Sequence, residues 1–177
     1  MSDFNQALPI ILKHEGGYVN NPADPGGATV YGISLRFLQQ NGIDIDSDGK
    51  VDANDIRATT VAKASDLYKK YFWDVGGYSR INDQTAATKV FDCSVNMGSG
   101  RAHKLAQSAA NACGKTLKVD GDLGPMSVAA INACDPKQFV VQMCRVQREF
   151  YEDLIQAKPQ LAVFRSGWLK RAAWPNG

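Results

Sequence analysis

Hydrophobic residues recur every three or four positions along most of the chain, which is the spacing of helices that bury one face. In the segment 60–73, for example, Val61, Ala64 and Tyr68 fall on one side. This pattern predicts a mainly α protein whose helices span residues 3–14, 35–41, 60–73, 85–97, 100–113, 126–133, 137–157 and 160–171.

The stretch from Tyr18 to Ile33 follows a different pattern. Gly26 and Gly27 favour a turn, and the run from Thr29 to Tyr31 favours extended backbone. We therefore expect at most a short β-hairpin near residues 18–33.

A carboxylate at the end of the first predicted helix is the strongest candidate for chemistry. Glu15 is followed at once by two glycines, which stop the helix and leave the carboxylate facing a loop. Asp24 lies nine positions later, and Thr29 follows Asp24 by five. Cleavage of a glycosidic bond needs a proton donor and a second group that stabilises the sugar cation or activates water. Alternatively, Glu15 caps a helix or pairs with an arginine, and Asp24 only begins a turn.

The whole segment carries a family resemblance. Glu15-Gly-Gly-Tyr-Val-Asn, Asp24-Pro-Gly-Gly-Ala-Thr29 and Gly32-Ile-Ser34 resemble the signature of glycoside hydrolase family 108 muramidases, which include many phage endolysins. The resemblance implies a compact lysozyme-like helical bundle in which Glu15 is the catalytic acid. It also implies cleavage between N-acetylmuramic acid and N-acetylglucosamine. Asp24 and Thr29 are assigned by analogy with other phage lysozymes, whose Asp-to-Thr spacing is six instead of five, so another Asp can hold the second role.

Further matches suggest residues that line a sugar groove. Tyr71-Phe72-Trp73-Asp74 resembles the family's aromatic helix end, and the segment 91–98 resembles a helix that presents Asp92 and Asn96 to the cleft. Trp73 is a candidate for stacking on a sugar, and Asn96 for binding an acetamido group. A core aromatic and a helix C-terminal amide are the alternative interpretations. Tyr18 and Tyr31, beside the candidate acid in sequence, complete the expected substrate-binding set.

An acidic loop has the spacing of an EF-hand calcium site. Its alternate carboxylates wrap an ion, Gly49 permits the sharp turn, and Lys50 ligates through its carbonyl. We expect a structural Ca²⁺ here and no cofactor for catalysis, with a solvated acidic loop as the alternative. The expected ligands are Asp44, Asp46, Asp48, Lys50, Asp52 and Asp55.

The C-terminal part carries a second motif. Residues 118–131, with Asp120-Gly-Asp-Leu-Gly-Pro125 at their centre, resemble the core of helical peptidoglycan-binding modules, although a purely architectural turn has the same pattern. We expect a catalytic region at 1–100 and a helical peptidoglycan-binding-like region at 101–177, packed as one compact unit. At 177 residues and 44% hydrophobic composition, the chain is long enough for one good core.

The charge distribution and the cysteine content indicate which partners and metals the chain is expected to bind. The net charge is +2, but 11 basic and 6 acidic residues follow position 100, against 9 and 12 before it. This cationic half favours an anionic polymer such as cell wall or nucleic acid, with solvated helix faces as the alternative. Nucleic acid is disfavoured because no basic run is interleaved with aromatic residues. Four cysteines without a CxxC pair, and only two histidines, argue against zinc and indicate buried thiols.

These observations predict a monomeric enzyme that acts on bacterial peptidoglycan and does not insert into membranes. The N-terminus lacks a signal peptide. We therefore expect synthesis in the host cytoplasm and action in the periplasm after release through a holin-type pore. The alternative is a non-catalytic cell-wall-binding or calcium-dependent interaction protein on the same scaffold.

Overall fold

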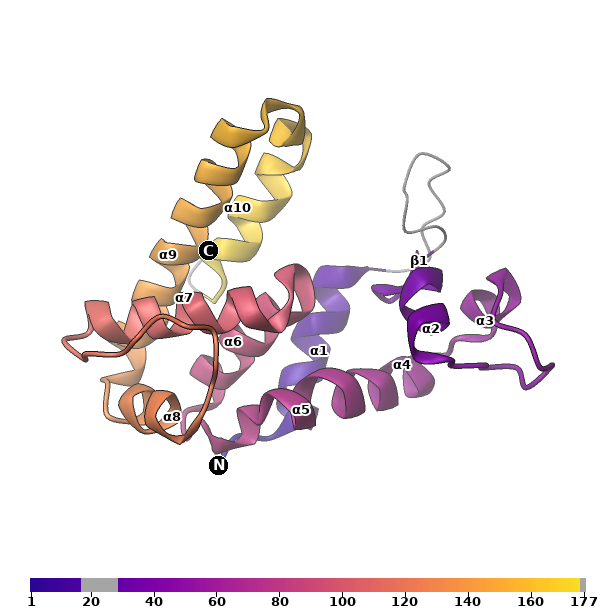
Figure 1. Ribbon diagram of the computed structural model, residues 1–177, viewed down its shortest axis with the longest axis horizontal. Helices are drawn as coiled ribbons and strands as arrows, with labels where there is room; N and C mark the ends of the chain where they lie inside the picture. Colours follow the sequence, from indigo (N-terminus) through magenta and orange to yellow (C-terminus); the bar gives the residue numbers. More distant parts are fainter. Residues whose placement is uncertain (17–28, 176–177) are drawn as a thin grey trace. The chain divides into compact units, whose positions relative to one another are not determined.

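The computed structural model describes residues 1–16 and 29–175, and its backbone contacts group the chain into two units. One unit is Leu8–Tyr71, and the other joins Met1–Ala7 to Phe72–Gly177. Helices dominate both units, and one short antiparallel hairpin is present in the described part (Figure 1). The predicted mainly helical, lysozyme-like fold class is confirmed.

The unit Leu8–Tyr71 holds the hairpin and several short helices. In chain order its described elements are α1 (Phe4–Glu15, from Leu8 onward), β1 (Thr29–Val30), β2 (Ile33–Ser34), α2 (Leu35–Asn41), α3 (Ala53–Ala58) and α4 (Val61–Tyr68). Its core is formed by apolar side chains from all of these, including Ile11, Val30, Ile33, Leu38, Ile56 and Leu67.

The hairpin is closed by a two-residue turn. Thr29 pairs with Ser34, and Val30 pairs with Ile33. The turn residues Tyr31 and Gly32 have φ angles of 49° and 76°, and such left-handed pairs match the twist of a tight hairpin. Ser34 then begins α2, because its hydroxyl accepts a hydrogen bond from the Phe37 N–H at 3.1 Å.

The second unit is built around α6 (Gln84–Met97), which packs against α7 (Ser99–Ala112) and α9 (Pro136–Ala157). Pro136 stands in the first turn of α9, where its missing N–H costs nothing. The remaining elements are α5 (Asp74–Gly76), η2 (Tyr78–Arg80), α8 (Pro125–Asn132), η3 (Pro159–Phe164) and α10 (Arg165–Ala173).

Most predicted helices lie within a few residues of the observed ones. The expected helix 60–73 is α4 followed by a π-helical turn, η1 (Lys69–Trp73), and the expected helix 160–171 begins as the 3₁₀ segment η3. The short α3, α5 and η2 were not predicted as helices. Elements of three to six residues make too few turns for a periodic pattern to emerge.

Buried charges tie α6 to the C-terminal helix α10. The Asp92 carboxylate pairs with the Arg171 guanidinium at 2.8 Å, and the Asp92 side chain is fully buried. Lys89 is also fully buried, and its Nζ donates to the carbonyl oxygens of Arg171, Ala172 and Trp174. A cation at these carbonyls satisfies the acceptors that a helix leaves open at its C-terminus.

The boundary predicted at residue 100 divides the sequence into a catalytic and a peptidoglycan-binding-like region, and this division stays a prediction. Helix α6, which precedes that boundary, packs against α7 and α9 in the larger unit. Its buried residues continue without interruption from Ala86 to Ser94, so this helix lies at the centre of the core of the larger unit.

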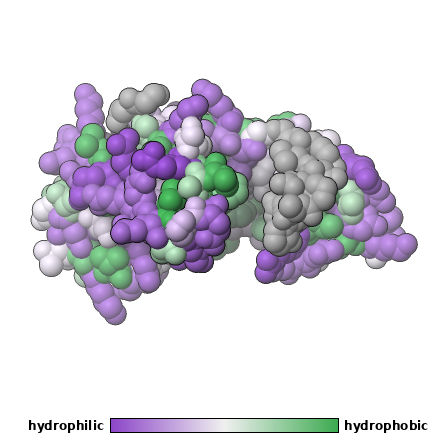
Figure 2. All heavy atoms as spheres, turned by 90° about the horizontal axis from the view of Figure 1, so that it is seen from above, coloured by the Kyte–Doolittle hydropathy of each residue, from purple (hydrophilic) through white to green (hydrophobic). Residues whose placement is uncertain are grey.

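The surface is largely hydrophilic, with separate hydrophobic patches, on the face shown in Figure 2. Within the described residues, the helices are too short or too polar to span a bilayer.

Candidate active site

Glu15 is the last residue of α1, as the sequence predicted. The helix ends because Gly16 takes a left-handed φ of 73°, and its N–H closes the final turn on the Leu12 carbonyl at 3.1 Å. The Glu15 side chain is half-buried. The end of α1 thus fixes where the Glu15 carboxyl begins its path, and the side chain is neither fully buried nor fully exposed.

The Glu15 carboxyl lies against the hairpin turn. A Cβ built on Gly32 would stand 2.7 Å from Glu15 Oε2 and 2.8 Å from Glu15 Cγ, closer than a real Cβ approaches. Gly32 therefore leaves the space that the carboxyl fills, besides supplying the positive φ that the turn requires.

Tyr68 reaches the same turn from α4. Its ring is buried, with 1% of its surface exposed, and its hydroxyl donates to the Tyr31 carbonyl oxygen at 2.7 Å. The hydroxyl also lies against the face of Gly32 that a side chain would occupy. Glu15, Gly32 and Tyr68 thus converge on one point of the smaller unit.

The structure describes two of the other expected site residues near Glu15 in sequence. Thr29 lies in β1 and is half-buried, and Tyr31 lies in the turn next to Gly32. Asp24 and Tyr18 lie outside the described residues. Of the expected set, the structure therefore brings Glu15 and Tyr31 to one turn.

Trp73 is placed in the core. It is 3% exposed, and its ring makes edge contacts with Phe4, Tyr78 and Phe91 at centroid distances of 5.8, 5.9 and 5.2 Å. A ring enclosed by other rings has no free face for a sugar, so this placement supports the core interpretation and corrects the expected stacking role.

Asn96 is half-buried near the end of α6. Its Oδ1 accepts a hydrogen bond from the Tyr151 hydroxyl at 2.7 Å, and that hydroxyl accepts one from Gln147 Nε2 at 3.0 Å. Because the oxygen of the amide is engaged, the Asn96 side chain offers its NH₂ group, a donor, to a ligand.

The acidic loop brings three of the expected ligands together. Carboxylate oxygens of Asp44, Asp46 and Asp48 lie within 4.8 Å of one another. Desolvation in the loop raises the pKa of Asp46, and the neighbouring carboxylates raise it further against an opposing hydrogen bond from the Asp48 N–H. Gly49, with φ of 87°, makes the expected sharp turn.

Asp52 and Asp55 have a different arrangement. The two form a capping box at the start of α3. Asp55 is 1% exposed, and its carboxylate accepts hydrogen bonds from the N–H groups of Ile45, Asp46 and Asp52. Burial alone raises the pKa of Asp55, but these hydrogen bonds outweigh it and lower the pKa. The Asp55 carboxylate therefore joins the two ends of the loop by accepting hydrogen bonds from backbone N–H groups of both.

The glycine-rich motif of the C-terminal region is held by α7. Gln107 Nε2 donates to Asp120 Oδ1 at 2.8 Å, and Gln107 Oε1 accepts from the Gly121 N–H at 2.9 Å. His103 contacts the Gly121 carbonyl through Nδ1 at 3.1 Å and the Tyr78 hydroxyl through Nε2 at 3.0 Å. The motif is thus a turn that the buried side chains of Gln107 and His103 hold through hydrogen bonds to its backbone and to Asp120.

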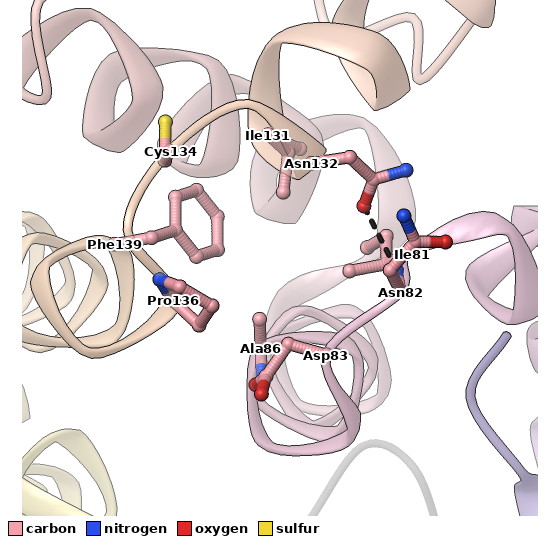
Figure 3. Close-up of a pocket in the computed structure, with 9 residues that line it drawn as sticks. All are labelled: Ile81, Asn82, Asp83, Ala86, Ile131, Asn132, Cys134, Pro136 and Phe139. Carbon is pink, nitrogen blue, oxygen red and sulfur yellow. Dashed lines mark hydrogen bonds between the residues drawn. The ribbon is translucent and has the colours of Figure 1, made fainter.

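A pocket between α6, α8 and α9 is too small for a sugar (Figure 3). Its volume is about 40 Å³, whereas pockets for organic ligands measure roughly 300–1,000 Å³. Ile81, Ile131 and Phe139 contribute apolar walls, and Asn132 Oδ1 accepts from the Asn82 N–H at 2.8 Å along one rim. We interpret it as a packing gap in the larger unit.

Tyr68 and Gly32 had no functional role in the sequence analysis. Tyr68 fits a helical hydrophobic stripe, and Gly32 appeared only as part of the family signature. The Tyr68 hydroxyl and the Glu15 carboxyl both lie beside Gly32, although Glu15 and Tyr68 are 53 positions apart in sequence, so no local pattern reveals this arrangement.

Comparison with known families agrees with the resemblance. A family model described as glycosyl hydrolase 108 matches residues 8–98. A model described as a predicted peptidoglycan domain matches residues 101–173. No curated protein matches the chain.

A solved structure has the same fold along almost the whole chain. The structure of Brucella abortus SagA superimposes with a TM-score of 0.76 and is 26% identical, covering 96% of this chain and 89% of its own. The likeness extends over both family regions.

Proposed function

The chain belongs to glycosyl hydrolase family 108 and is a glycosidase that acts on peptidoglycan; from this we propose that it hydrolyses the β-1,4 bond between N-acetylmuramic acid and N-acetylglucosamine. One observation carries the proposal. Glu15 ends α1 with a half-buried carboxyl that lies against Gly32, a position suited to a proton donor.

In the proposed reaction, the Glu15 carboxyl donates its proton to the oxygen of the departing sugar. The bond from this oxygen to the anomeric carbon then breaks, and a water molecule supplies the hydroxyl that completes hydrolysis. Asp24 is proposed to stabilise the sugar cation or activate the water, and Thr29 to hold that water.

Substrate binding is proposed for residues on both family regions. Tyr18 and Tyr31 stand beside the catalytic segment in sequence, and Asn96 offers an amide NH₂ that suits an acetamido carbonyl oxygen. The region 101–173 is proposed to hold the glycan strand or its peptides. Its surplus of basic residues would attract the carboxylates of the stem peptides.

The catalytic role of Glu15 is tested with a substitution that removes its proton donor and keeps its shape. Glu15→Gln is expected to bind isolated sacculi like the parent and to lower the rate of glycan release by at least ~100-fold, within the range assigned to general acids. Glu149→Gln, at an exposed glutamate paired with Arg145, is the matched control and should keep full activity. Unchanged release by Glu15→Gln would overturn the proposal.

We also propose that the loop 44–55 binds a structural Ca²⁺ through Asp44, Asp46, Asp48 and the Lys50 carbonyl, with Asp52 completing the set. The grouping of three carboxylates within 4.8 Å supports this, since a divalent cation would relieve their mutual repulsion. Asp55 would act mainly as the buried acceptor that closes the loop. No catalytic step is assigned to the ion.

A role in cell lysis is proposed as well. The protein would be made in the host cytoplasm as a monomer and would reach peptidoglycan in the periplasm once a holin-type pore opens. Expression in a Gram-negative host should leave cells intact until the inner membrane is permeabilised, and only then cause lysis. Glu15→Gln should cause none, and lysis without permeabilisation would contradict the release route.

A further inference from the structure

We propose that Tyr68 is a positioning residue for the catalytic acid: its hydroxyl holds the Tyr31–Gly32 turn, and the turn holds the carboxyl of Glu15. The inference rests on the proposed role of Glu15. Tyr68 itself does not need to touch substrate.

The first step is the anchoring of Tyr68. Its ring is 1% exposed at the C-terminal end of α4, so its position is fixed by packing. Its hydroxyl hydrogen is directed to the Tyr31 carbonyl at 2.7 Å. A buried hydroxyl needs such a partner, and the bond joins two elements that are 37 residues apart.

The second step is the turn. Tyr31 has a φ of 49°, and among the described residues it shares a left-handed φ outside glycine only with Ser47. That conformation costs a residue with a side chain about 1–2 kcal/mol, so it persists where surrounding contacts impose it. The hydrogen bond from Tyr68 acts on the carbonyl of this strained residue.

The third step is the contact with the acid. Gly32 follows Tyr31, and its bare Cα faces both Glu15 Oε2 and the Tyr68 hydroxyl. A shift of the turn by a fraction of an ångström would alter the space open to the carboxyl. Displacing a reacting group by about 1 Å can cost 100-fold in rate.

A role in packing alone would not require the hydroxyl, because phenylalanine fills the same volume. Tyr68→Phe therefore separates the two explanations. We expect kcat on soluble peptidoglycan fragments to fall about 10-fold, with KM within twofold of the parent, since Tyr68 bonds the backbone carbonyl of Tyr31 and not the side chain that is proposed to bind substrate.

Tyr78→Phe is the matched control. Tyr78 is also a fully buried tyrosine, but it lies in the larger unit. There its hydroxyl is hydrogen-bonded to His103 of the same unit. Both variants lose one buried hydrogen bond, worth about 1 kcal/mol, and should show similar losses of stability in urea. Equal effects of the two on kcat would overturn the positioning role.

A double-mutant cycle supplies a second test, which remains informative if Tyr68→Phe is less stable. Glu15→Asp shortens the side chain by one methylene, so its carboxyl no longer lies against Gly32 in the same way. Tyr68→Phe should then cost less than twofold in the Glu15→Asp background, against about 10-fold in the parent. Equal losses in both backgrounds would show that Tyr68 acts independently of the acid.

The two proposals fail in different ways. If Glu15→Gln is as active as the parent, the proposed catalytic role itself fails. If Glu15→Gln is inactive while Tyr68→Phe keeps the parental kcat, Glu15 remains the acid and the positioning role alone is refuted.

Discussion

The carboxyl group of Glu15 occupies the space that a side chain at Gly32 would need, with Oε2 only 2.7 Å from the position of that missing Cβ. The two residues lie on different elements, the end of α1 and the turn between β1 and β2. The hairpin turn thus helps to position the Glu15 side chain.

Gly32→Ala should therefore damage activity more than stability. The added methyl group would push against Glu15, and the left-handed backbone would add a strain of about 1–2 kcal/mol. We expect kcat to fall at least ~100-fold, as for a displaced reacting group.

Gly42→Ala is the control for backbone strain. Gly42 ends α2 with a φ of 61°, and a Cβ there would meet no atom within 4 Å. It should show the loss of stability in urea that backbone strain alone causes and keep its kcat. If both alanine variants keep the parental kcat, the contact between Gly32 and Glu15 has no catalytic importance.

Loss of one partner of the buried pair Asp92–Arg171 should destabilise the larger unit more than loss of a surface ion pair does. Arg171→Met would leave a fully buried carboxylate without its cation, which costs about 3–5 kcal/mol. Arg165→Met removes the surface pair with Glu152, whose side chains are 53% and 38% exposed, and should cost less than about 1 kcal/mol. Urea unfolding followed by circular dichroism measures both, and equal losses would contradict this ranking.

Stability should fall in mild acid because of His103. Burial lowers the pKa of this histidine, and the nearby Arg80 cation also lowers it, against opposing effects of the Gly121 carbonyl and Asp122. The unfolded chain therefore binds a proton near the ordinary value of 6.5, while the folded chain still resists it.

The free energy of unfolding should consequently decrease as the pH falls below 6.5, until the depressed folded pKa is passed. His103→Gln should have a shallower pH dependence in this window. Parallel curves for parent and variant in urea titrations across the window would show that His103 does not contribute.

Calcium should raise the thermal midpoint if the loop 44–55 binds it. A ligand present at 100 times its Kd stabilises the folded state by about 2.7 kcal/mol, and chelator should reverse the shift. Asp46→Asn should abolish most of the shift, and Asp153→Asn, at an exposed position of α9, should preserve it. A midpoint that calcium leaves unchanged in the parent would exclude a structural ion in this loop.

Sequence patterns identified the long helices and the position of Glu15 at a helix end, because both depend on local information. Helical periodicity identified α6 and α9 within one residue at each end, and two glycines marked the end of α1 at Glu15. The hairpin was placed near residues 18–33, and its strands lie at the C-terminal end of that range and one residue beyond.

Contacts between distant residues were beyond such patterns. Lysine side chains usually face solvent, yet Lys89 is fully buried because the carbonyl groups at the end of α10 accept its hydrogen bonds. Tryptophan is a residue type that stacks on sugars, yet three aromatic rings enclose Trp73. In both cases the partners are distant in sequence, so the residue type alone gave the wrong or an ambiguous environment.

Glu15 is proposed to protonate the leaving sugar when the bond that follows N-acetylmuramic acid is hydrolysed. The most direct measurement is mass spectrometry of fragments released from isolated Gram-negative peptidoglycan, after borohydride reduction that labels each new reducing end. The account predicts reduced N-acetylmuramic acid ends from the parent and none from Glu15→Gln. Reduced N-acetylglucosamine ends, non-reducing anhydro sugars, or equal release by the two proteins would contradict it.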